Sequence, residues 1–194
     1  MKLHKSMTIA LSATCFIGVG WYLYADRQIR TVSYDASQVS YRTSNELEAS
    51  AKLLISGVPL KQENHVTYDK DGFIQESFTV TSLQIQKVFA NPSGLDLKKS
   101  DIIQVAEPIY VLDNGIKPGK TEFSINGYKK MKMNSSYFLV LKPDITYPNL
   151  FVISGTNQGK YNIDNSDLHE KDHVNDKEKN DKFKEDFVRK YKIQ

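Results

Sequence analysis

The longest run of apolar residues lies near the start of the chain, in residues 7–25. It reads MTIALSATCFIGVGWYLYA, nineteen residues without a charge, and it is preceded by Lys5 and followed by Asp26. A helix rises about 1.5 Å per residue, so a run of this length nearly crosses the ~30 Å hydrocarbon layer of a bilayer. We therefore predict a transmembrane signal-anchor over residues 7–25, with residues 1–6 as a cytoplasmic stub and the folded domain outside the cell.

Two other interpretations of this segment stay open. Cleavage near Ala25 would turn the anchor into a signal peptide and release a secreted protein, although the residues before Ala25 are large for a cleavage motif. Lipid attachment at Cys15, the only cysteine, is disfavoured by the apolar residues that continue after it. Trp21, Tyr22 and Tyr24 suit the aromatic belt at a membrane surface. We favour the uncleaved anchor.

The polar segment after the anchor leads into the first elements of a folded domain. Residues 26–43 are polar with isolated aromatic residues, and we interpret them as a stalk or connection. Ser44 is predicted to cap a short helix, because acidic residues follow in its first turn. The next residues, 52–58, have strand character, and Gly57 is predicted to mark a β-bulge or a close approach of two backbones.

The strongest predicted strand covers residues 73–89. Four apolar side chains lie in its middle: Phe78, Val80, Leu83 and Ile85. The first two and the last two have opposite parity, so they would face opposite sides of a regular strand. A β-bulge near residues 81–82 would return all four to one core and bend the strand around a small barrel. The alternative is two strands separated by a break.

The rest of the domain is predicted to consist of short strands. They are expected at residues 101–105, 107–112, 121–125, 137–141 and 150–153. Residues 107–112 and 121–125 are expected to pair as a hairpin, and residues 137–141 are apolar enough for a strand covered on both faces. Six or seven strands with one short helix predict a mainly β fold, a barrel or sandwich, over residues 44–163.

Residues 164–194 form a charged tail. Almost no apolar residue occurs between positions 164 and 181, which predicts a largely disordered segment. Phe183, Phe187 and Tyr191 are spaced like one face of a helix. A C-terminal helix docked on the domain and a solvated tail are both open.

Charge and cysteine usage narrow the class of protein. The net charge is +3, but residues 1–30 alone carry four basic residues and one acidic residue. The folded part is therefore near neutral, which argues against binding to nucleic acid through a basic surface. The single cysteine lies in the predicted anchor, so the exported domain contains no disulfide. This pattern is typical of a surface protein of Gram-positive bacteria.

One motif in the tail suggests metal chemistry. His169-Glu170-Lys171-Asp172-His173 matches the H-E-x-x-H pattern, in which two histidines bind zinc and the glutamate acts as a base. The surroundings are charged rather than apolar, and only 21 residues follow to supply a third ligand. His169 and His173 are therefore weak metal candidates, and we predict no catalytic residue and no cofactor.

Several landmarks together resemble a known kind of domain. They are the Gly57 strand, the end of the long strand at residues 85–89, Tyr137 in an apolar strand, and the Gly155-x-x-Gln158-Gly159-Lys160-Tyr161 sequence. This series is similar to uncharacterised anchored or secreted domains of Gram-positive bacteria, and loosely similar to the OB-like barrel of tissue inhibitors of metalloproteinases and netrin modules.

The resemblance implies a small OB-like β-barrel over residues 44–163, with structural roles for Gly57, Tyr137, Gly155 and Gly159. Asn134 stands where that pattern usually has glycine, and asparagine tolerates the same left-handed turn. The inhibitors act through a cysteine-rich edge that this chain lacks, so their activity does not transfer.

These observations lead to one hypothesis and two alternatives. The leading hypothesis is a non-enzymatic, membrane-anchored extracytoplasmic module that binds a protein, a peptide or an envelope polymer. The first alternative is a metal-dependent hydrolase that uses His169, Glu170 and His173. The second is a structural accessory subunit that contacts its partner through a C-terminal helix.

Overall fold

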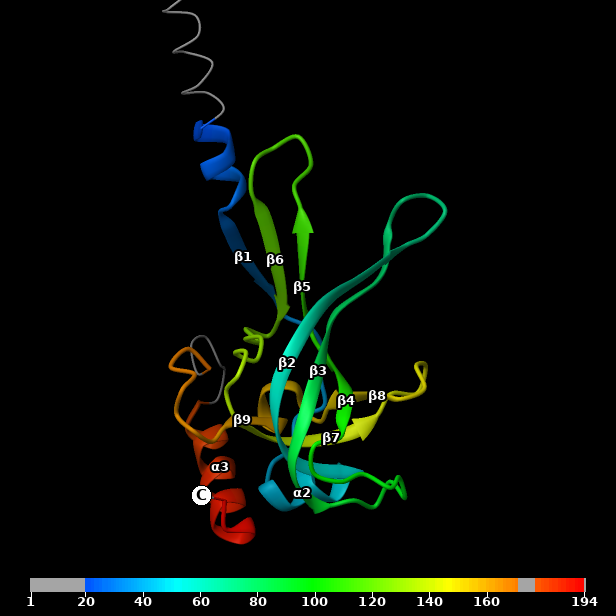
Figure 1. Ribbon diagram of the computed structural model, residues 1–194, viewed down its shortest axis with the longest axis vertical. Coiled ribbons are helices and arrows are strands. Elements are labelled where there is room, and N and C mark those ends of the chain that lie inside the picture. Colours follow the sequence, from blue (N-terminus) through cyan, green and yellow to red (C-terminus); the bar gives the residue numbers. More distant parts are fainter. Residues whose placement is uncertain (1–19, 171–176, 194) are drawn as a thin grey trace, which may run out of the picture. The chain divides into compact units, whose positions relative to one another are not determined.

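The computed structural model describes residues 20–170 and 177–193, which are mainly β with a C-terminal helix (Figure 1). Most of the predicted anchor, residues 7–19, lies outside the described residues. Within the described ranges, no helix is both long and apolar enough to span a bilayer. The chain divides into a smaller unit, described over residues 20–32 and 111–123, and a larger unit of Ser33–Tyr110 and Ser124–Gln194.

The elements follow one another along the chain, and most of them are strands. They are β1 (Ile29–Tyr34), α2 (Ser44–Ser50), β2 (Leu53–Tyr68), β3 (Ile74–Ala90), β4 (Ile102–Glu107), β5 (Ile109–Asp113), β6 (Lys120–Ile125), β7 (Tyr137–Pro143), β8 (Leu150–Ile153), the 3₁₀ turn η1 (Thr156–Gly159), β9 (Lys160–Asn162) and α3 (Lys177–Tyr191). The strands form one sheet of order β1-β6-β5 and another of order β2-β3-β4-β8-β7-β9.

The strands of the larger sheet form a closed ring, because the first strand also pairs with β7. Strand β2 pairs with β3 along most of its length and also pairs with β7 through residues 53–57. The pair β4–β8 is parallel, whereas the β2–β3, β3–β4, β7–β8 and β2–β7 pairs are antiparallel. Five strands therefore form a closed series of hydrogen-bonded neighbours, in the order β2, β3, β4, β8, β7 and back to β2.

Strand β7 separates two apolar clusters. Tyr137, Leu139 and Leu141 belong to the cluster enclosed by the ring of strands, together with Leu53, Ile55, Leu83, Ile85, Val105 and Phe151. Phe138 and Val140 point the other way, into a cluster that includes residues of α2 and α3. The prediction of a strand covered on both faces is confirmed, and it explains why residues 137–141 contain no charged side chain.

The predicted bulge near residues 81–82 is wrong. The β3–β4 register runs without a shift from Thr79 to Gln84, and the irregularity lies on the opposite strand, between Pro59 and Lys61. Thr79 and Thr81 are buried in phase with Leu83 and Ile85, whereas Phe78 and Val80 are half-buried on the other face. The hydroxyl groups explain this burial, because Thr79 Oγ1 donates to Ile109 O at 2.6 Å and Thr81 Oγ1 donates to Glu107.

Helix α2 begins as predicted, but its cap lies one residue earlier. Thr43 is the N-cap residue, and its hydroxyl oxygen accepts a hydrogen bond from Glu46 N at 3.2 Å. Glu46 Oε2 in turn accepts from Arg42 N. Ser44 Oγ instead donates to Asp186 Oδ2 in α3 at 2.8 Å. The residue predicted as the cap therefore links the two helices.

The predicted stalk is partly ordered. Residues 29–34 form β1, which pairs with β6 rather than serving only as a connection. The predicted hairpin is confirmed, because β5 and β6 are neighbours in the same sheet. The domain predicted over residues 44–163 is also divided, since residues 111–123 belong to the smaller unit.

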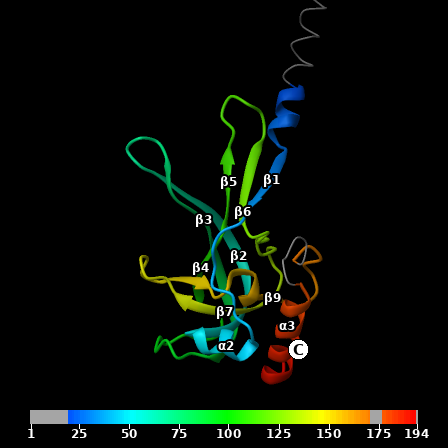
Figure 2. The ribbon, with the colours of Figure 1, turned by 180° about the vertical axis from the view of Figure 1, so that it is seen from behind.

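The tail is not largely disordered over the residues that the structure describes. Residues 177–191 form α3, which lies beside β9 in both views of the molecule (Figures 1 and 2). Phe183 and Phe187 are buried in the second apolar cluster, and the Phe187 ring lies against the rings of Phe138 and Tyr161. Of the two alternatives, the docked helix is the one observed. The i, i+4, i+8 spacing therefore marks a stripe that packs on the chain's own domain.

Candidate functional site

A groove of about 430 Å³ runs across one face of the larger unit. Its walls come from the first part of β3, the end of β4, strand β8 and the loop between β7 and β8. The lining residues include Glu76, Phe78, Pro108, Ile125, Asp144, Thr146, Tyr147, Leu150 and Val152. Most of these side chains are apolar or aromatic, and the lining contains carboxylates but no lysine or arginine.

An aromatic cluster forms one end of this groove. His65 of β2 stacks on Phe78 of β3, with 4.5 Å between ring centroids, and both rings meet the edge or face of Tyr147 at about 6 Å. The Tyr147 hydroxyl donates a hydrogen bond to Glu76 Oε2, which also lies 3.7 Å from His65 Nε2. The hydrogen bond to Glu76 raises the pKa of the Tyr147 hydroxyl. Tyr147 is thereby held in place beside the Glu76 carboxylate.

The loop between β7 and β8 has a defined conformation. Asp144 Oδ1 accepts hydrogen bonds from Thr146 N at 2.7 Å and from Tyr147 N at 2.9 Å, the arrangement of an Asx turn. Asn149 adopts a left-handed conformation before β8 begins. These contacts place Tyr147 over the groove and leave Ile145 fully exposed.

The groove lies beside an open strand edge. The β3–β4 ladder begins at the pair Thr79–Glu107, so residues 74–78 of β3 pair with β2 alone among the described strands. The chain leaves β4 through Pro108, which has no N–H to continue the ladder. A short length of strand edge therefore borders the groove.

A buried carboxyl group, that of Glu107, lies among the residues that line the groove. Glu107 is fully buried, and its carboxyl oxygens accept hydrogen bonds from four donors. The donors are Thr81 Oγ1, Gln62 Nε2 at 3.2 Å, Tyr128 OH at 2.8 Å and Met131 N at 2.7 Å. Four donors from three segments occupy this carboxyl group, so its role is to hold β2, β3, β4 and residues 128–131 together.

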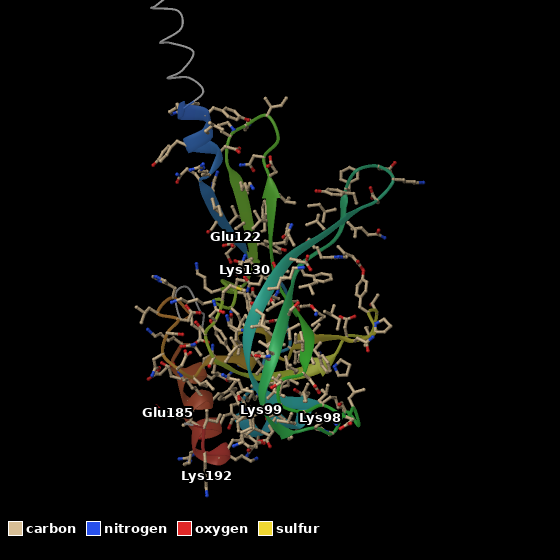
Figure 3. All side chains as sticks on the ribbon, in the orientation of Figure 1. Lys98, Lys99, Glu122, Lys130, Glu185 and Lys192 are labelled. Atoms are coloured by element: carbon tan, nitrogen blue, oxygen red, sulfur yellow. The ribbon has the colours of Figure 1, made fainter. Side chains whose placement is uncertain are left out.

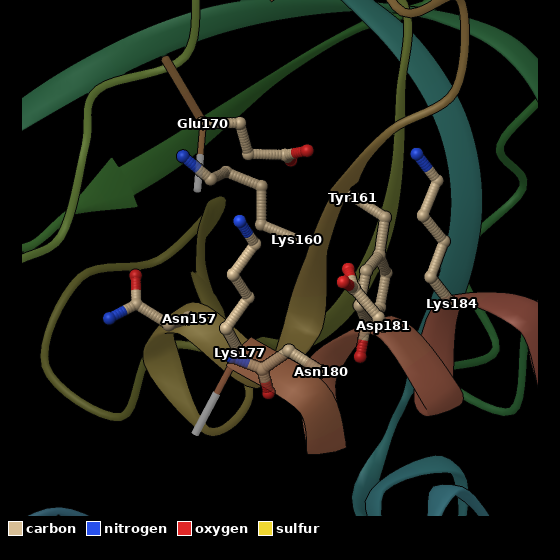
Figure 4. Close-up of a pocket in the computed structure, with 8 residues that line it drawn as sticks. All are labelled: Asn157, Lys160, Tyr161, Glu170, Lys177, Asn180, Asp181 and Lys184. Carbon is tan, nitrogen blue, oxygen red and sulfur yellow. The ribbon is translucent and has the colours of Figure 1, made fainter. Parts of the chain in front are cut away.

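A second polar cluster surrounds Lys160, a buried cation (Figure 4). Its Nζ lies 4.3 Å from the centroid of the Tyr128 ring and donates to Lys129 O. Burial lowers the pKa of the Lys160 ammonium group, and the charges of Glu107, Glu170 and Asp167 oppose that change. Burial likewise raises the pKa of Glu170, against the opposing charge of Lys160.

Groups with shifted pKa values are candidates for catalysis, but the space beside Lys160 is too small for a substrate. The cavity lined by Lys160, Glu170, Asn180 and Asp181 measures about 20 Å³. That volume suits a single water molecule. Glu170 Oε1 also accepts a hydrogen bond from Asn162 N at 2.5 Å, so its carboxylate joins β9 to the following segment. We interpret this cluster as structural.

The predicted metal site is not assembled in the described residues. His169 and Glu170 lie in a turn rather than a helix, and His173 lies outside the described residues. His169 is exposed, whereas Glu170 is buried and directed toward Asn162. Within residues 20–170 and 177–193, no cluster of three or more His, Cys, Asp or Glu side chains could hold a metal ion.

Two of the three glycines singled out in the sequence, Gly57 and Gly159, lie where two backbones meet. Gly57 sits at a register shift, and a Cβ there would be 2.8 Å from Gln84 O. A Cβ on Gly159 would be 2.2 Å from Ser154 O. Gly155 has a left-handed conformation against the Tyr41 ring. Asn134 has a φ of 62° in the turn before β7, a left-handed conformation that asparagine tolerates.

Tyr137, the remaining structural candidate, connects three segments. Its ring is fully buried, and its hydroxyl donates to Asp167 Oδ2 at 2.6 Å and accepts from Lys132 N at 2.7 Å. Burial raises the pKa of this hydroxyl, as does the hydrogen bond to Asp167. Tyr137 therefore fastens β7 both to the preceding loop and to the start of the tail.

The sequence reasoning missed the groove and the buried carboxyl group. Tyr147 and Phe78 belong to different segments, and no local pattern links them. Glu107 carried a signal that could have been used. It continues the alternation of Ile103 and Val105, so its parity alone predicts a carboxyl group that faces the core.

Comparison with known proteins adds no family assignment: no family model matches this chain, and no curated protein matches it.

Proposed function

We propose that this protein is a membrane-anchored, extracytoplasmic binding module that takes an extended peptide segment into the groove beside residues 74–78. The observation that carries this proposal is the groove itself, with its apolar lining and its open strand edge. Residues 7–25 would anchor the module, with the folded part outside a Gram-positive cell. The absence of cysteine from residues 16–194 suits that location.

The order of the strands supports an OB-like barrel. OB folds are five-stranded Greek-key barrels, and they bind ligands on the face of their second and third strands and on the loops between strands 1–2 and 4–5. Taken in chain order, the five strands of the ring are β2, β3, β4, β7 and β8, so β3 and β4 are the second and third strands and the loop of residues 144–149 joins the fourth to the fifth. The groove lies on that face.

An extended peptide suits the groove better than a folded surface does. Volumes of about 300–1,000 Å³ are typical of sites that enclose small ligands or side chains, and this groove measures about 430 Å³. A peptide that adds to a strand edge gains affinity from main-chain hydrogen bonds and specificity from pockets for alternate side chains. Residues 74–78 offer the edge, and the groove offers the pocket.

Charge indicates which peptides would bind. Glu76 and Asp144 are partly exposed at the rim, and no basic residue lines the groove. Elsewhere on the larger unit, Lys98, Lys99, Glu185 and Lys192 are exposed, with both signs of charge represented (Figure 3). We therefore propose a ligand with an apolar side chain next to a lysine or arginine. Nucleic acid is disfavoured, because phosphates would meet carboxylates.

The two alternatives receive less support. A hydrolase would need His169, Glu170 and His173 on one helix, and His169 and Glu170 lie in a turn. An accessory subunit that used α3 would have to use its charged face, because Phe183 and Phe187 are already buried within the chain. The hollow of about 940 Å³ between α2 and α3 is lined mainly by charged and polar side chains, so in the described residues α3 offers a partner no apolar surface comparable to that of the groove.

Selection from a library of random bead-bound peptides tests the ligand class directly. Labelled full-length protein in detergent micelles is expected to enrich peptides with a basic residue beside an apolar one. The double variant Glu76→Gln/Asp144→Asn should reduce binding of the enriched peptides about tenfold, because each lost ion pair at a partly exposed site contributes up to about 1 kcal/mol.

The same variant supplies its own structural control. Each introduced amide side chain would keep an oxygen, which can accept from Tyr147 OH at position 76 and from the amides of Thr146 and Tyr147 at position 144. Only the two charges are therefore removed, and the unfolding temperature should match that of the unaltered protein. Enrichment of acidic peptides, or equal binding by the double variant, would contradict the proposed site.

A further inference from the structure

The smaller unit presents apolar side chains where the predicted anchor ends. Residues 20–26 are helical, and Trp21, Leu23 and Tyr24 are exposed on them. The preceding residues, 7–19, carry no charge. Exposed tryptophan and tyrosine at the end of an uncharged run are typical of the interface between a bilayer and water.

The loop between β5 and β6 is fastened to the end of this helix. Gly119 N donates to Asp26 Oδ1 at 3.2 Å, and Lys120 N donates to Gln28 O at 2.9 Å. The approach is close enough that a Cβ on Gly119 would lie 3.3 Å from Ala25 O. Residues distant in sequence therefore meet at the point where the uncharged run gives way to polar chain.

This loop exposes an apolar residue and a lysine, and a second exposed lysine begins β6. Ile116 is 96% exposed, and Lys117 and Lys120 are also exposed. The loop is braced from within, since Gly115 N donates to Asp113 Oδ1 and Thr121 Oγ1 donates to Asn114 Oδ1, both at 2.8 Å. A braced loop that exposes an isoleucine beside lysines has the composition of a membrane-surface contact.

We propose that the β5–β6 loop is a second membrane-contacting element, in which Ile116 enters the lipid interface and Lys117 and Lys120 meet anionic headgroups. This inference rests on the proposed anchor, because the uncharged run brings the smaller unit to a bilayer. A single span leaves a domain free to rotate about it. A second contact would restrict that motion and fix the orientation of the smaller unit on the membrane.

Fluorescence quenching by lipid-linked quenchers tests the inference with a matched control. In a Cys15→Ser background, Ile116→Cys and Ile145→Cys each provide one labelling site for an environment-sensitive dye. Ile145 is also an isoleucine in an exposed loop, but it belongs to the larger unit. The full chain is reconstituted into phosphatidylcholine vesicles that contain phosphatidylglycerol and a headgroup-proximal quencher in both leaflets.

The dye at position 116 is expected to be quenched about twofold or more strongly than the dye at position 145, because interfacial side chains lie about 5–10 Å into the headgroup region. Flotation of the same samples separates the two claims. If the protein does not float with the vesicles, the anchor and this inference both fail. If it floats and the two positions are quenched equally, the anchor stands and the loop contact is wrong.

Discussion

Replacing Glu107 with alanine is expected to lower the free energy of unfolding by about 3–5 kcal/mol, because each buried donor left without an acceptor costs about 1–3 kcal/mol. The carboxyl group accepts hydrogen bonds from Thr81, Gln62, Tyr128 and Met131, which lie on β2, β3 and the segment before β7. Its removal leaves these buried donors without an acceptor. Thermal unfolding of the purified full chain in detergent should show a decrease of roughly 6–20 °C in Tm.

A glutamate on another strand of the same sheet provides the control for this substitution. Glu63 of β2 is exposed, and its Oε1 lies 2.8 Å from Lys61 Nζ. The same change there, Glu63→Ala, should cost less than about 1 kcal/mol, because exposed ion pairs contribute little. Equal effects of the two substitutions would show that the Glu107 network does not hold the ring of strands together.

Phe187→Ala in α3 should lower the free energy of unfolding by about 3–5 kcal/mol, as large-to-small changes of buried phenylalanine do. The Phe187 ring is 1% exposed, and its centroid lies 5.2 Å from that of Phe138 and 5.8 Å from that of Tyr161. The loss would open a cavity between α3 and β7. Denaturant unfolding followed by circular dichroism measures the change.

Phe73→Ala is the matched control for the helix. Phe73 is 72% exposed at the tip of the β2–β3 hairpin, so its loss should change stability by no more than about 0.5 kcal/mol. If Phe187→Ala were as harmless as Phe73→Ala, α3 would not be docked on the domain. The tail would then behave as the solvated segment that its composition suggested.

The fold class followed from the sequence because strand alternation is a local signal. Residues 137–141 were predicted as a strand covered on both faces, and β7 has that arrangement. The predicted phase of β3 rests on Phe78, Val80, Leu83 and Ile85 alone. Thr79 and Thr81 instead share the buried face with Leu83 and Ile85, because their hydroxyl groups are hydrogen-bonded inside the protein.

The expected disorder of the tail is wrong for residues 164–170, because composition does not show which groups elsewhere in the chain pair with them. Residues 164–170 contain few apolar side chains, so they were expected to be disordered. Their polar groups are instead paired: Asp164 Oδ2 accepts from Ser136 N at 2.7 Å, and Glu170 accepts from Asn162 N. No sequence pattern within the tail predicts these contacts with residues 136 and 162.

The candidate site was the least predictable part. Its members come from β3, β4, β8 and the loop before β8, and they meet only because the strands close into a ring. Sequence spacing carries no information about that closure. The local motif that did stand out, at residues 169–173, lies in a charged segment and forms no metal site among the described residues.

Photocrosslinking in intact cells tests most directly whether the groove is the contact surface. A photoreactive amino acid in place of Thr146 lies in the groove, and one in place of Glu185 lies on the exposed face of α3. We predict a discrete crosslinked polypeptide from position 146, competed by the basic–apolar peptides selected in vitro, and none from position 185. A crosslink from position 185 alone would contradict the groove and favour an accessory subunit that binds through its C-terminal helix.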